Sequence, residues 1–237
     1  RAYGHFMLVN LFAKHYDPAT ADDDPGIPYV TEPETVFIKQ YERLSVEEVY
    51  ERIEEDLLEG LEDVNDGYYA NSGKYHFTKN AALGFASRFY LFKQDYNNCI
   101  RYSSQMLGLD PGLFIKDIYR LLDETVTDTE FTQEYTSPDD ASNLLLIRNI
   151  TNYPVNVGYW PDINLIQNLF LSNPWGAEDA RFARGYPVYV RGSGITLNKY
   201  QFLFERSSLT SNVGLNYTVM AVLRGEEVLL NRAESHA

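Results

Sequence analysis

The stretch from Phe77 to Pro111 constrains the fold most, because its pattern predicts two helices that turn back on each other. Thr78 can cap a helix from Lys79 to about Lys93, since its hydroxyl can accept a hydrogen bond from a first-turn backbone N–H. Apolar residues recur along this helix at intervals of three and four, which defines an apolar face. Further apolar residues extend that face around most of the helix circumference. They are Ala82, Leu83, Phe85, Ala86, Phe89, Tyr90, Leu91 and Phe92. We therefore expect this helix to be buried on most sides.

The second helix, from about Asn97 to Leu107, follows a turn that resembles a tetratricopeptide repeat. Residues 95–100 match the repeat's inter-helix turn and second-helix start, and residues 106–111 match its closing "ALxLDP". Cys99 and Met106 stand where the repeat has Ala, and Gln94 replaces its usual turn Gly. One such unit cannot bury its own faces, so it predicts stacked neighbours. The expected fold class is mainly α, a tetratricopeptide-like helical array (α-α superhelix) with a small antiparallel β-meander and long loops.

The amino-acid composition excludes several classes of function. The chain has 237 residues, of which 44% are hydrophobic, which is enough for a substantial core. A formal net charge of −14 argues against a nucleic-acid partner, because neutralising phosphates needs clustered Lys and Arg. The sequence contains no apolar run of membrane-spanning length. A single cysteine, Cys99, excludes an internal disulfide and a cysteine-based metal site, and its position on an apolar face predicts a small core residue.

The first half contains two further helices. Ser45 and Glu48 form a capping-box pattern before a helix to about Asp63 that is apolar on one face and acidic on the other. An opening helix, about Ala2 to Lys14, is expected to pack through Tyr3, Phe6, Met7, Asn10 and Leu11. Three consecutive Asp, residues 22–24, lack the alternating ligands, interior Gly and distal Glu of a calcium loop, so we predict no metal there.

In the second half of the chain, the apolar patterns that predict helices and strands are shorter. We predict a short helix over Leu113–Asp123, a polar surface excursion over Thr125–Asp140, a strand over Leu144–Ile147 and a helix over Ile163–Leu171. From Tyr186 onward apolar residues alternate, which predicts the antiparallel meander. We expect a single helical-repeat domain over residues 1–237, truncated at both ends, with residues 141–221 as a loop and meander insertion.

The last helix is predicted from Val222 to the end. Val222, Leu229, Leu230 and Ala233 are expected to face inward. Glu226 falls on the same face, and a buried carboxylate needs a partner. Arg224, Arg232 or an arginine of another helix could supply it.

The sequence contains no signature of an enzyme active site. It has no His-Glu-x-x-His metal motif, no Gly-x-Ser-x-Gly nucleophile elbow and no complete phosphate loop. Pairs of carboxylates are unavoidable among 34 acidic residues, so they do not identify a glycosidase. We predict no catalytic residue, no cofactor and no metal.

One aromatic loop favours ligand binding. Tyr153, Tyr159 and Trp160 lie in a segment that Pro and Gly keep out of regular structure, and Trp175 lies in a second loop. Exposed rings can stack on a sugar ring, and nearby amides such as Asn156 can bond its hydroxyls. The alternative is that these rings fill the gap between the loop and the helices.

Six segments, in order, resemble the SusD/RagB family of outer-membrane glycan-binding lipoproteins. Residues 49–57 resemble its "VYxxIxxDL" helix, residues 81–96 its "AAxxxxARxYLxxxDY" helix and residues 223–234 its "LRxxEvlLnrAEA" helix. The other three are its first array helix, the loop after it and its "DxRF" step, at residues 1–12, 26–30 and 179–182. Gly225 departs from the family's usual apolar residue, and Asn143-Leu144 from its usual acid before a short strand.

The resemblance implies a non-enzymatic protein that holds a starch-like or other oligosaccharide at the bacterial surface. It further implies an extracellular location on the outer membrane, a partner in a TonB-dependent (SusC-like) transporter, and a lipid anchor that is not in this sequence. Ring and amide positions expected to bind the sugar are Trp160, Tyr159, Tyr153, Trp175 and Asn156. A helical-repeat adaptor for another protein is the alternative function, and a glycosidase is a third.

Overall fold

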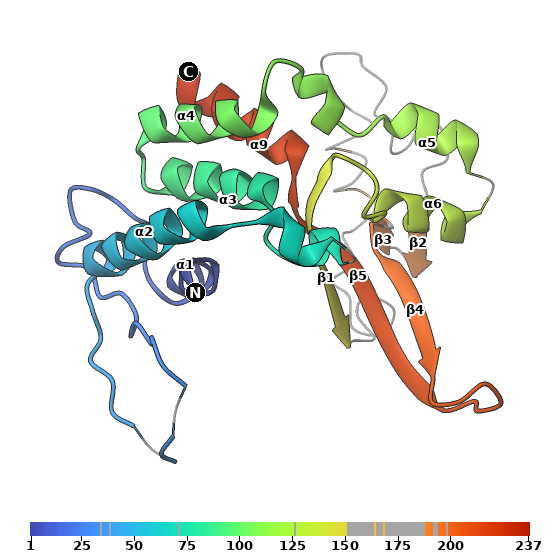
Figure 1. The fold of residues 1–237 in the computed structure, drawn as a ribbon, viewed down its shortest axis with the longest axis horizontal. Helices are drawn as coiled ribbons and strands as arrows, with labels where there is room; N and C mark the ends of the chain where they lie inside the picture. The colour runs from blue at the N-terminus through green and yellow to red at the C-terminus, as the bar shows by residue number, and fades with distance from the viewer. Residues whose placement is uncertain are drawn as a thin grey trace. The chain divides into compact units, whose positions relative to one another are not determined.

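The structure, a computed structural model, describes residues 1–150 except 34, 38, 71 and 126, together with 164, 168, 188–191, 194–197 and 199–237. The chain forms two compact units (Figure 1). Unit 1 comprises Arg1–Gly112 and Leu223–Ala237, and unit 2 comprises Leu113–Val222. Whether they act as one domain with an insertion stays a prediction.

Unit 1 is an array of helices in which α3 is central. Its helices are α1 (Ala2–Phe12), α2 (Val46–Asp63), α3 (Lys79–Phe92), α4 (Tyr96–Leu107) and α9 (Gly225–His236). Helix α3 packs directly against α2, α4 and α9, and aromatic rings of α1 reach it as well. The predicted mainly α, tetratricopeptide-like fold class is therefore confirmed.

The sequence of α3 explains its central place. The Thr78 hydroxyl accepts a hydrogen bond from the Ala81 N–H at 3.2 Å, which caps the helix as predicted. Small residues let neighbouring helices approach closely, while rings fill the spaces between them. Phe6 of α1 meets Phe85 and Phe89 of α3 edge-on, with ring centroids 5.4 and 6.2 Å apart. Such edge-to-face contacts are the favoured geometry for aromatic pairs.

The α3–α4 turn shows what replaces the repeat's glycine. Gln94 takes a φ of 61°, the left-handed conformation that glycine adopts without strain. Its side chain donates a hydrogen bond to the Tyr16 carbonyl at 3.1 Å. Asp95 then caps α4 by accepting from the Asn98 N–H at 3.1 Å. Cys99 is fully buried, which confirms its predicted core role.

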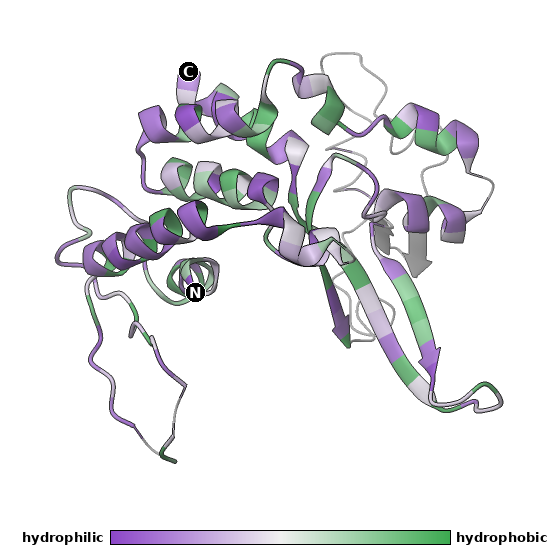
Figure 2. Ribbon diagram, viewed as in Figure 1, coloured by the Kyte–Doolittle hydropathy of each residue, from purple (hydrophilic) through white to green (hydrophobic). Residues whose placement is uncertain are grey.

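Helix α2 confirms the predicted capping box and apolar face. The Glu48 N–H donates to the Ser45 hydroxyl, and the Ser45 N–H donates to the Glu48 carboxylate. Hydrophilic residues run along α2, whereas hydrophobic residues recur along α3 (Figure 2). On the acidic face of α2, Glu54 is half-buried, where it accepts a hydrogen bond from Tyr90 and pairs with Lys93 of α3.

Helix α1 presents a different face from the one expected. Phe6 is buried as predicted, but Val9 is fully buried and the predicted Met7 and Leu11 are exposed. This helix is apolar on nearly every side, so the spacing of apolar residues could not select one face. Docking on α2 decides which side is covered.

Helix α9 begins three residues later than predicted, at Gly225. Residues 222–224 belong instead to strand β5 (Gly214–Arg224). The inward side of α9 also differs from the predicted one. Val228 and Asn231 are buried, whereas Leu230 and Ala233 are exposed. The prediction for Glu226 is confirmed, because Arg224 pairs with it at 3.2 Å.

Polar contacts fix α9 on the array. Asn231 donates from its amide to the Ser87 hydroxyl at 3.1 Å, and Cys99 donates to the Asn231 carbonyl at 3.6 Å. Arg88 of α3 binds Glu227 of α9 through two hydrogen bonds of 2.5 and 2.6 Å. These contacts fix the position of α9 along the axis of α3.

Unit 2 contains a helix that the sequence reading missed. Helix α5 (Ile118–Glu124) overlaps the second half of the predicted 113–123 helix and is preceded by a 3₁₀ turn. The predicted surface excursion contains α6 (Asp128–Tyr135). Thr127 and Glu130 form a capping box, and Phe131 and Tyr135 are buried against α5. The polar composition of this segment concealed two apolar rings spaced one helical turn apart.

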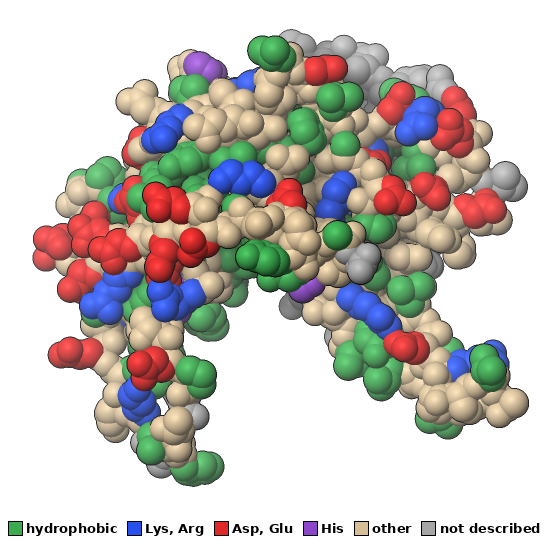
Figure 3. All heavy atoms as spheres, in the orientation of Figure 1, with side chains coloured by type: hydrophobic (Ala, Val, Ile, Leu, Met, Phe, Trp, Pro, Cys, Tyr) green, Lys and Arg blue, Asp and Glu red, His purple; other side chains and the backbone are tan. Residues whose placement is uncertain are grey.

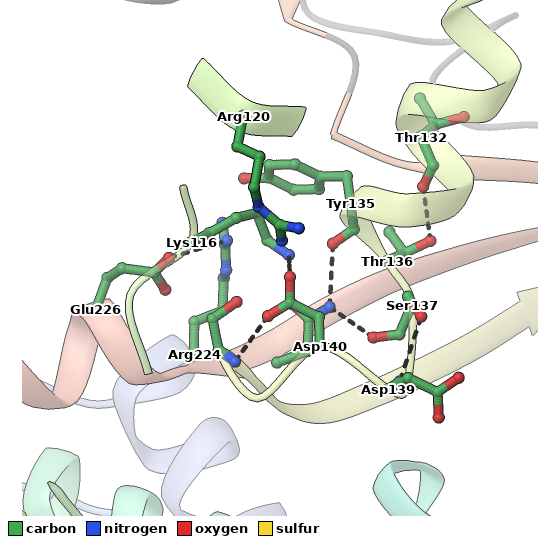
Figure 4. Close-up of polar contacts among 12 residues, drawn as sticks. Lys116, Arg120, Thr132, Tyr135, Thr136, Ser137, Asp139, Asp140, Arg224 and Glu226 are labelled. Atoms are coloured by element: carbon green, nitrogen blue, oxygen red, sulfur yellow. Dashed lines mark hydrogen bonds and ion pairs between the residues drawn. The ribbon is translucent and has the colours of Figure 1, made fainter. Parts of the chain in front are cut away.

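A charge is buried beside this small core. Lys116 pairs with Asp140 and lies over the Tyr135 ring, 5.2 Å from its centroid (Figure 4). Burial works to raise the pKa of Asp140, but the bonds from Lys116 and Ser142 lower it overall. The Asn143 amide donates to the carbonyls of Tyr135 and Ser137, which fixes the start of the following strand.

The strands of the described residues form two separate sheets. One has the order β1-β5-β4, from β1 (Asn143–Ile150), β5 and β4 (Gln201–Arg206), and the other pairs β2 (Val188–Arg191) with β3 (Gly194–Leu197). Both hairpins are antiparallel, with Leu203 opposite Tyr217 in β4–β5. The predicted strand at 144–147 and the small antiparallel sheet are confirmed. The strands after Tyr186 do not form one continuous meander, because the β2–β3 hairpin and the β4–β5 hairpin belong to different sheets. The predicted helix over 163–171, apart from positions 164 and 168, lies outside the described residues.

The Arg88–Glu227 pair gives the first test of this packing. Its side chains are 15% and 34% exposed, so replacing Arg88 by Met should lower the free energy of unfolding by about 1–3 kcal/mol. Urea denaturation with the Arg88→Met, Glu227→Gln and double variants measures the coupling. Arg120→Met is the control, because the Arg120–Glu124 pair is 66% and 59% exposed and should contribute about 0.5 kcal/mol or less. If Arg88→Met and Arg120→Met lowered the free energy of unfolding equally, the stabilising role assigned to the Arg88–Glu227 pair would be contradicted.

Candidate functional site

The predicted sugar-binding residues Trp160, Tyr159, Tyr153, Trp175 and Asn156 lie outside the described residues, so their role stays a prediction. Among the described residues, no group of three or more His, Cys, Asp or Glu could hold a metal ion. In the same part of the chain, no helix is long and apolar enough to cross a membrane.

A polar cluster in unit 1 joins three segments that are distant in sequence. Asp56 of α2 accepts hydrogen bonds from the Arg1 guanidinium, at 2.5 Å from Nε, and from the Tyr29 hydroxyl at 2.5 Å. The Tyr29 hydroxyl also lies 3.1 Å from the Arg52 carbonyl. Asp56 therefore connects α2 to the start of α1 and to the loop that follows α1.

His5 completes this cluster. Its ring stacks on Tyr29, with centroids 3.8 Å apart and planes 15° from parallel. The Val30 N–H donates to His5 Nε2 at 3.0 Å, so Nε2 is the acceptor nitrogen. Nδ1 then carries the proton and donates to the Arg1 carbonyl at 3.3 Å. Both nitrogens are bonded only in the neutral ring.

The environment shifts the pKa of each group accordingly. Burial lowers the pKa of His5 from its ordinary 6.5. Burial works to raise the pKa of Asp56, but the hydrogen bonds from Arg1 and Tyr29 lower it overall. Burial and the bond to Asp56 raise the pKa of Tyr29. The cluster is thus held as a charged pair with neutral His5 and Tyr29 near pH 7.

A pocket of about 140 Å³ opens beside the cluster, where α1, α2 and α3 meet. Its wall is mainly apolar and includes Tyr3, Leu61, Val64, Phe77 and Phe85, while Arg1 and Asp56 supply its charged part. Tyr3 touches both Phe77 and Phe85 edge-on, with centroids 5.4 and 5.2 Å apart. Gly60 also lines the pocket, and a Cβ there would meet no atom within 4 Å.

The connection between α2 and α3 exposes several aromatic rings. Tyr68 is 79% exposed, Tyr75 is 40% exposed, and Tyr69 stacks on His76 with ring centroids 4.1 Å apart. The connection begins next to Val64 and ends at Phe77, both of which line the pocket. Pocket and exposed rings thus adjoin along the chain in unit 1.

Sequence reasoning did not single out this site, although signals for it were present. Tyr29 and Asp56 both fall in segments that resemble family motifs, and the segment 68–76 contains three Tyr and one His. What was missing is the pairing of Asp56 with residues far away in sequence. No local spacing encodes such a contact.

A buried helix with stacked helical neighbours and a small inserted sheet defines a tetratricopeptide-like helical-array protein. Residues 1–91 match a SusD-like family model that is described as "starch-binding associating with outer membrane". This family match and the shared fold confirm the resemblance to the SusD/RagB family. A search of curated proteins found no match to the chain.

Solved structures share the fold along nearly the whole chain. A SusD superfamily protein of Bacteroides vulgatus is 17% identical with a TM-score of 0.64, covering 99% of this chain and 51% of its own. A SusD superfamily protein of Bacteroides thetaiotaomicron is 17% identical with a TM-score of 0.63, covering 99% and 52%. A laminarin-binding SusD-like protein is 19% identical with a TM-score of 0.60, covering 100% and 57%. The chain thus spans about half the length of these proteins.

The His5 contacts predict a pH dependence of stability. Because the pKa of His5 is lower in the folded than in the unfolded chain, this stabilisation is complete above about pH 6.5 and is lost as the pH falls through the folded pKa. The urea midpoint of the wild type should therefore fall more between pH 7.5 and 5.5 than that of His5→Gln. Asp56 titrates below its ordinary 3.8, outside this window. If the urea midpoints of the wild type and His5→Gln fell by the same amount over this pH range, the contacts assigned to His5 would be refuted.

The open space at Gly60 predicts a stabilising substitution. Gly60→Ala should raise the free energy of unfolding by about 0.5–1 kcal/mol, because alanine restricts the unfolded chain and favours the helix. Gly26→Ala is the contrasting variant, since its Cβ would lie 2.6 Å from the Ser45 carbonyl oxygen. It should lower the stability. Denaturation midpoints that shift in the same direction would contradict the described surroundings of Gly60.

Proposed function

We propose that this chain is part of a non-catalytic protein that binds oligosaccharide at the bacterial cell surface. The observation that carries the proposal is the SusD-like match over residues 1–91, together with the fold shared with solved proteins that are described as carbohydrate-binding. One of those relatives is described as laminarin-binding, which supports a glycan ligand for this chain. The helices of unit 1 would serve as the rigid scaffold.

The location and partner follow from the same similarity. The matching family model is described as associating with the outer membrane, which supports an extracellular position there, held by a lipid anchor. From that position the protein would deliver bound sugar to a TonB-dependent transporter of the SusC-like kind. The SusD/RagB resemblance supports both inferences. Co-purification with such a transporter from membranes tests the partnership.

Sugar would bind through aromatic stacking and amide hydrogen bonds. Trp160, Tyr159, Tyr153 and Trp175 would supply rings, and Asn156 an amide. Their segment combines Tyr, Trp, Pro and Gly, a composition that favours exposed rings over regular structure.

A helical-repeat adaptor is the second candidate. Helix α1 carries Leu8, Leu11 and Phe12 on its exposed side, and exposed apolar surface of this kind can bind another protein. Capture of a soluble protein partner, combined with no affinity for any glycan on an array, would favour the adaptor.

Single ring removals test the proposed sugar site. Trp160→Ala and Tyr159→Ala should each weaken oligosaccharide binding by about 2- to 12-fold, because a stacked ring contributes about 0.5–1.5 kcal/mol. Isothermal titration with maltooligosaccharides and laminarioligosaccharides measures the effect, and unchanged thermal unfolding shows that the fold is retained. Tyr119→Ala, which removes a ring that is 43% exposed on α5, is the matched control. Unchanged affinity in both loop variants would remove this site from the proposal.

A further inference from the structure

We infer that the α2–α3 connection carries a second contact surface for a neutral oligosaccharide, formed by Tyr68, Tyr69, Tyr75 and His76. We refer to these residues as the tyrosine platform. The inference rests on the proposed glycan-binding function but concerns residues of unit 1, which are separate in sequence from the loop residues 153–175.

The exposure of the rings is the first argument. Tyr68 is 79% exposed, although burial of a tyrosine ring would contribute to stability. Tyr69 and His76 do not cover it; they stack on each other with planes 14° from parallel. A tyrosine combines an apolar face with a hydroxyl at its edge, and a pyranose likewise combines apolar C–H faces with hydroxyls at its edge. Such a ring can stack on a sugar and hydrogen-bond it at once.

Preorganisation is the second argument. The Asn65 side chain accepts from the Gly67 N–H at 2.9 Å, which starts the 3₁₀ turn Asp66–Tyr69. Asp66 accepts from the Lys79 N–H at 2.7 Å, and Lys79 Nζ donates to the Leu61 carbonyl at 2.7 Å. Asp66 thus attaches the connection to the start of α3, and the Lys79 side chain joins α3 directly to α2. Rings that are already fixed lose less conformational entropy when a ligand binds.

The backbone restricts the second half of the connection as well. The Tyr75 N–H donates to the Ser72 carbonyl, and the His76 N–H donates to the Gly73 carbonyl, each at 3.1 Å. Gly73 has a φ of 40°, in the left-handed region, so the turn that presents Tyr75 depends on a glycine. A connection built in this way holds its rings in place without a buried core of its own.

Charge selects the class of sugar. Glu62, Asp63 and Asp66 are exposed at the α2 end of the platform, and Lys74 is the platform segment's basic residue. Asp and Glu side chains also gather over α2 on the face shown in Figure 3. Anionic chains such as polyuronates would be repelled by this surface at low salt. A neutral oligosaccharide is therefore the expected ligand.

The test compares double variants of the platform with a loop variant. Isothermal titration measures the binding of neutral oligosaccharides, maltooligosaccharides and laminarioligosaccharides, to the wild type, Tyr68→Ala/Tyr75→Ala, Trp160→Ala and the combination. The platform variant should bind the preferred long oligosaccharide about 2- to 12-fold more weakly per ring removed. Tyr68→Phe/Tyr75→Phe keeps the stacking faces and loses only the hydroxyls, so it should bind more tightly than Tyr68→Ala/Tyr75→Ala. Oligogalacturonides, which are anionic, should bind less tightly than neutral chains of equal length at low salt.

Two controls separate binding from folding. Tyr96→Ala removes a ring that is 47% exposed on α4, in the same unit, and should leave binding unchanged. Thermal unfolding of the platform variant should match that of the wild type, since both rings are exposed.

The outcomes distinguish this inference from the proposed function. Loss of affinity in Trp160→Ala with wild-type affinity in the platform variant overturns the platform alone. Loss in the platform variant with wild-type affinity in Trp160→Ala supports the platform and overturns the loop site. A wild type that binds none of the neutral oligosaccharides overturns both. A platform variant that loses capture of a protein partner but not of sugar also overturns the inference.

Discussion

Burial of α3 is the constraint on which the rest of unit 1 depends. Its rings and small residues leave almost no polar surface, so the helix is stable only when other helices cover it. Helices α2, α4 and α9 and the rings of α1 provide that cover. Removing any one of them would expose apolar surface worth about 25 cal/mol per Å². The array is therefore a consequence of one helix that cannot face water.

Apolar packing brings the helices together, but polar pairs determine their alignment. Asp56 with Tyr29, Glu54 with Tyr90, and Arg88 with Glu227 each join segments that are well separated along the chain. Such bonds are directional, and a half-buried charge without its partner would be costly. Each pair consequently favours one register over neighbouring ones that would bury similar apolar area.

An array of this kind is a scaffold from which the connections between helices project. In the α2–α3 connection, Asp66 is hydrogen-bonded to the first residue of α3, which ties the connection to the array. Binding by rings in fixed positions avoids the entropy cost of ordering a loop. The SusD superfamily structures share this helical scaffold.

The sequence alone determined the features that are encoded locally. The Ser45 and Thr78 caps, the turn at Gln94 and the buried face of α2 all follow from spacing over a few residues, because helix geometry relates neighbours three or four apart. The family resemblance also came from such local motifs. The tertiary structure decided the rest. The buried side of α1 could not be read from a helix that is apolar on nearly every side, and α9 starts late because strand β5 extends through Arg224. The Asp56 cluster required contacts over 27 and 55 residues of sequence separation, and packing, which local patterns do not record, brought those side chains together.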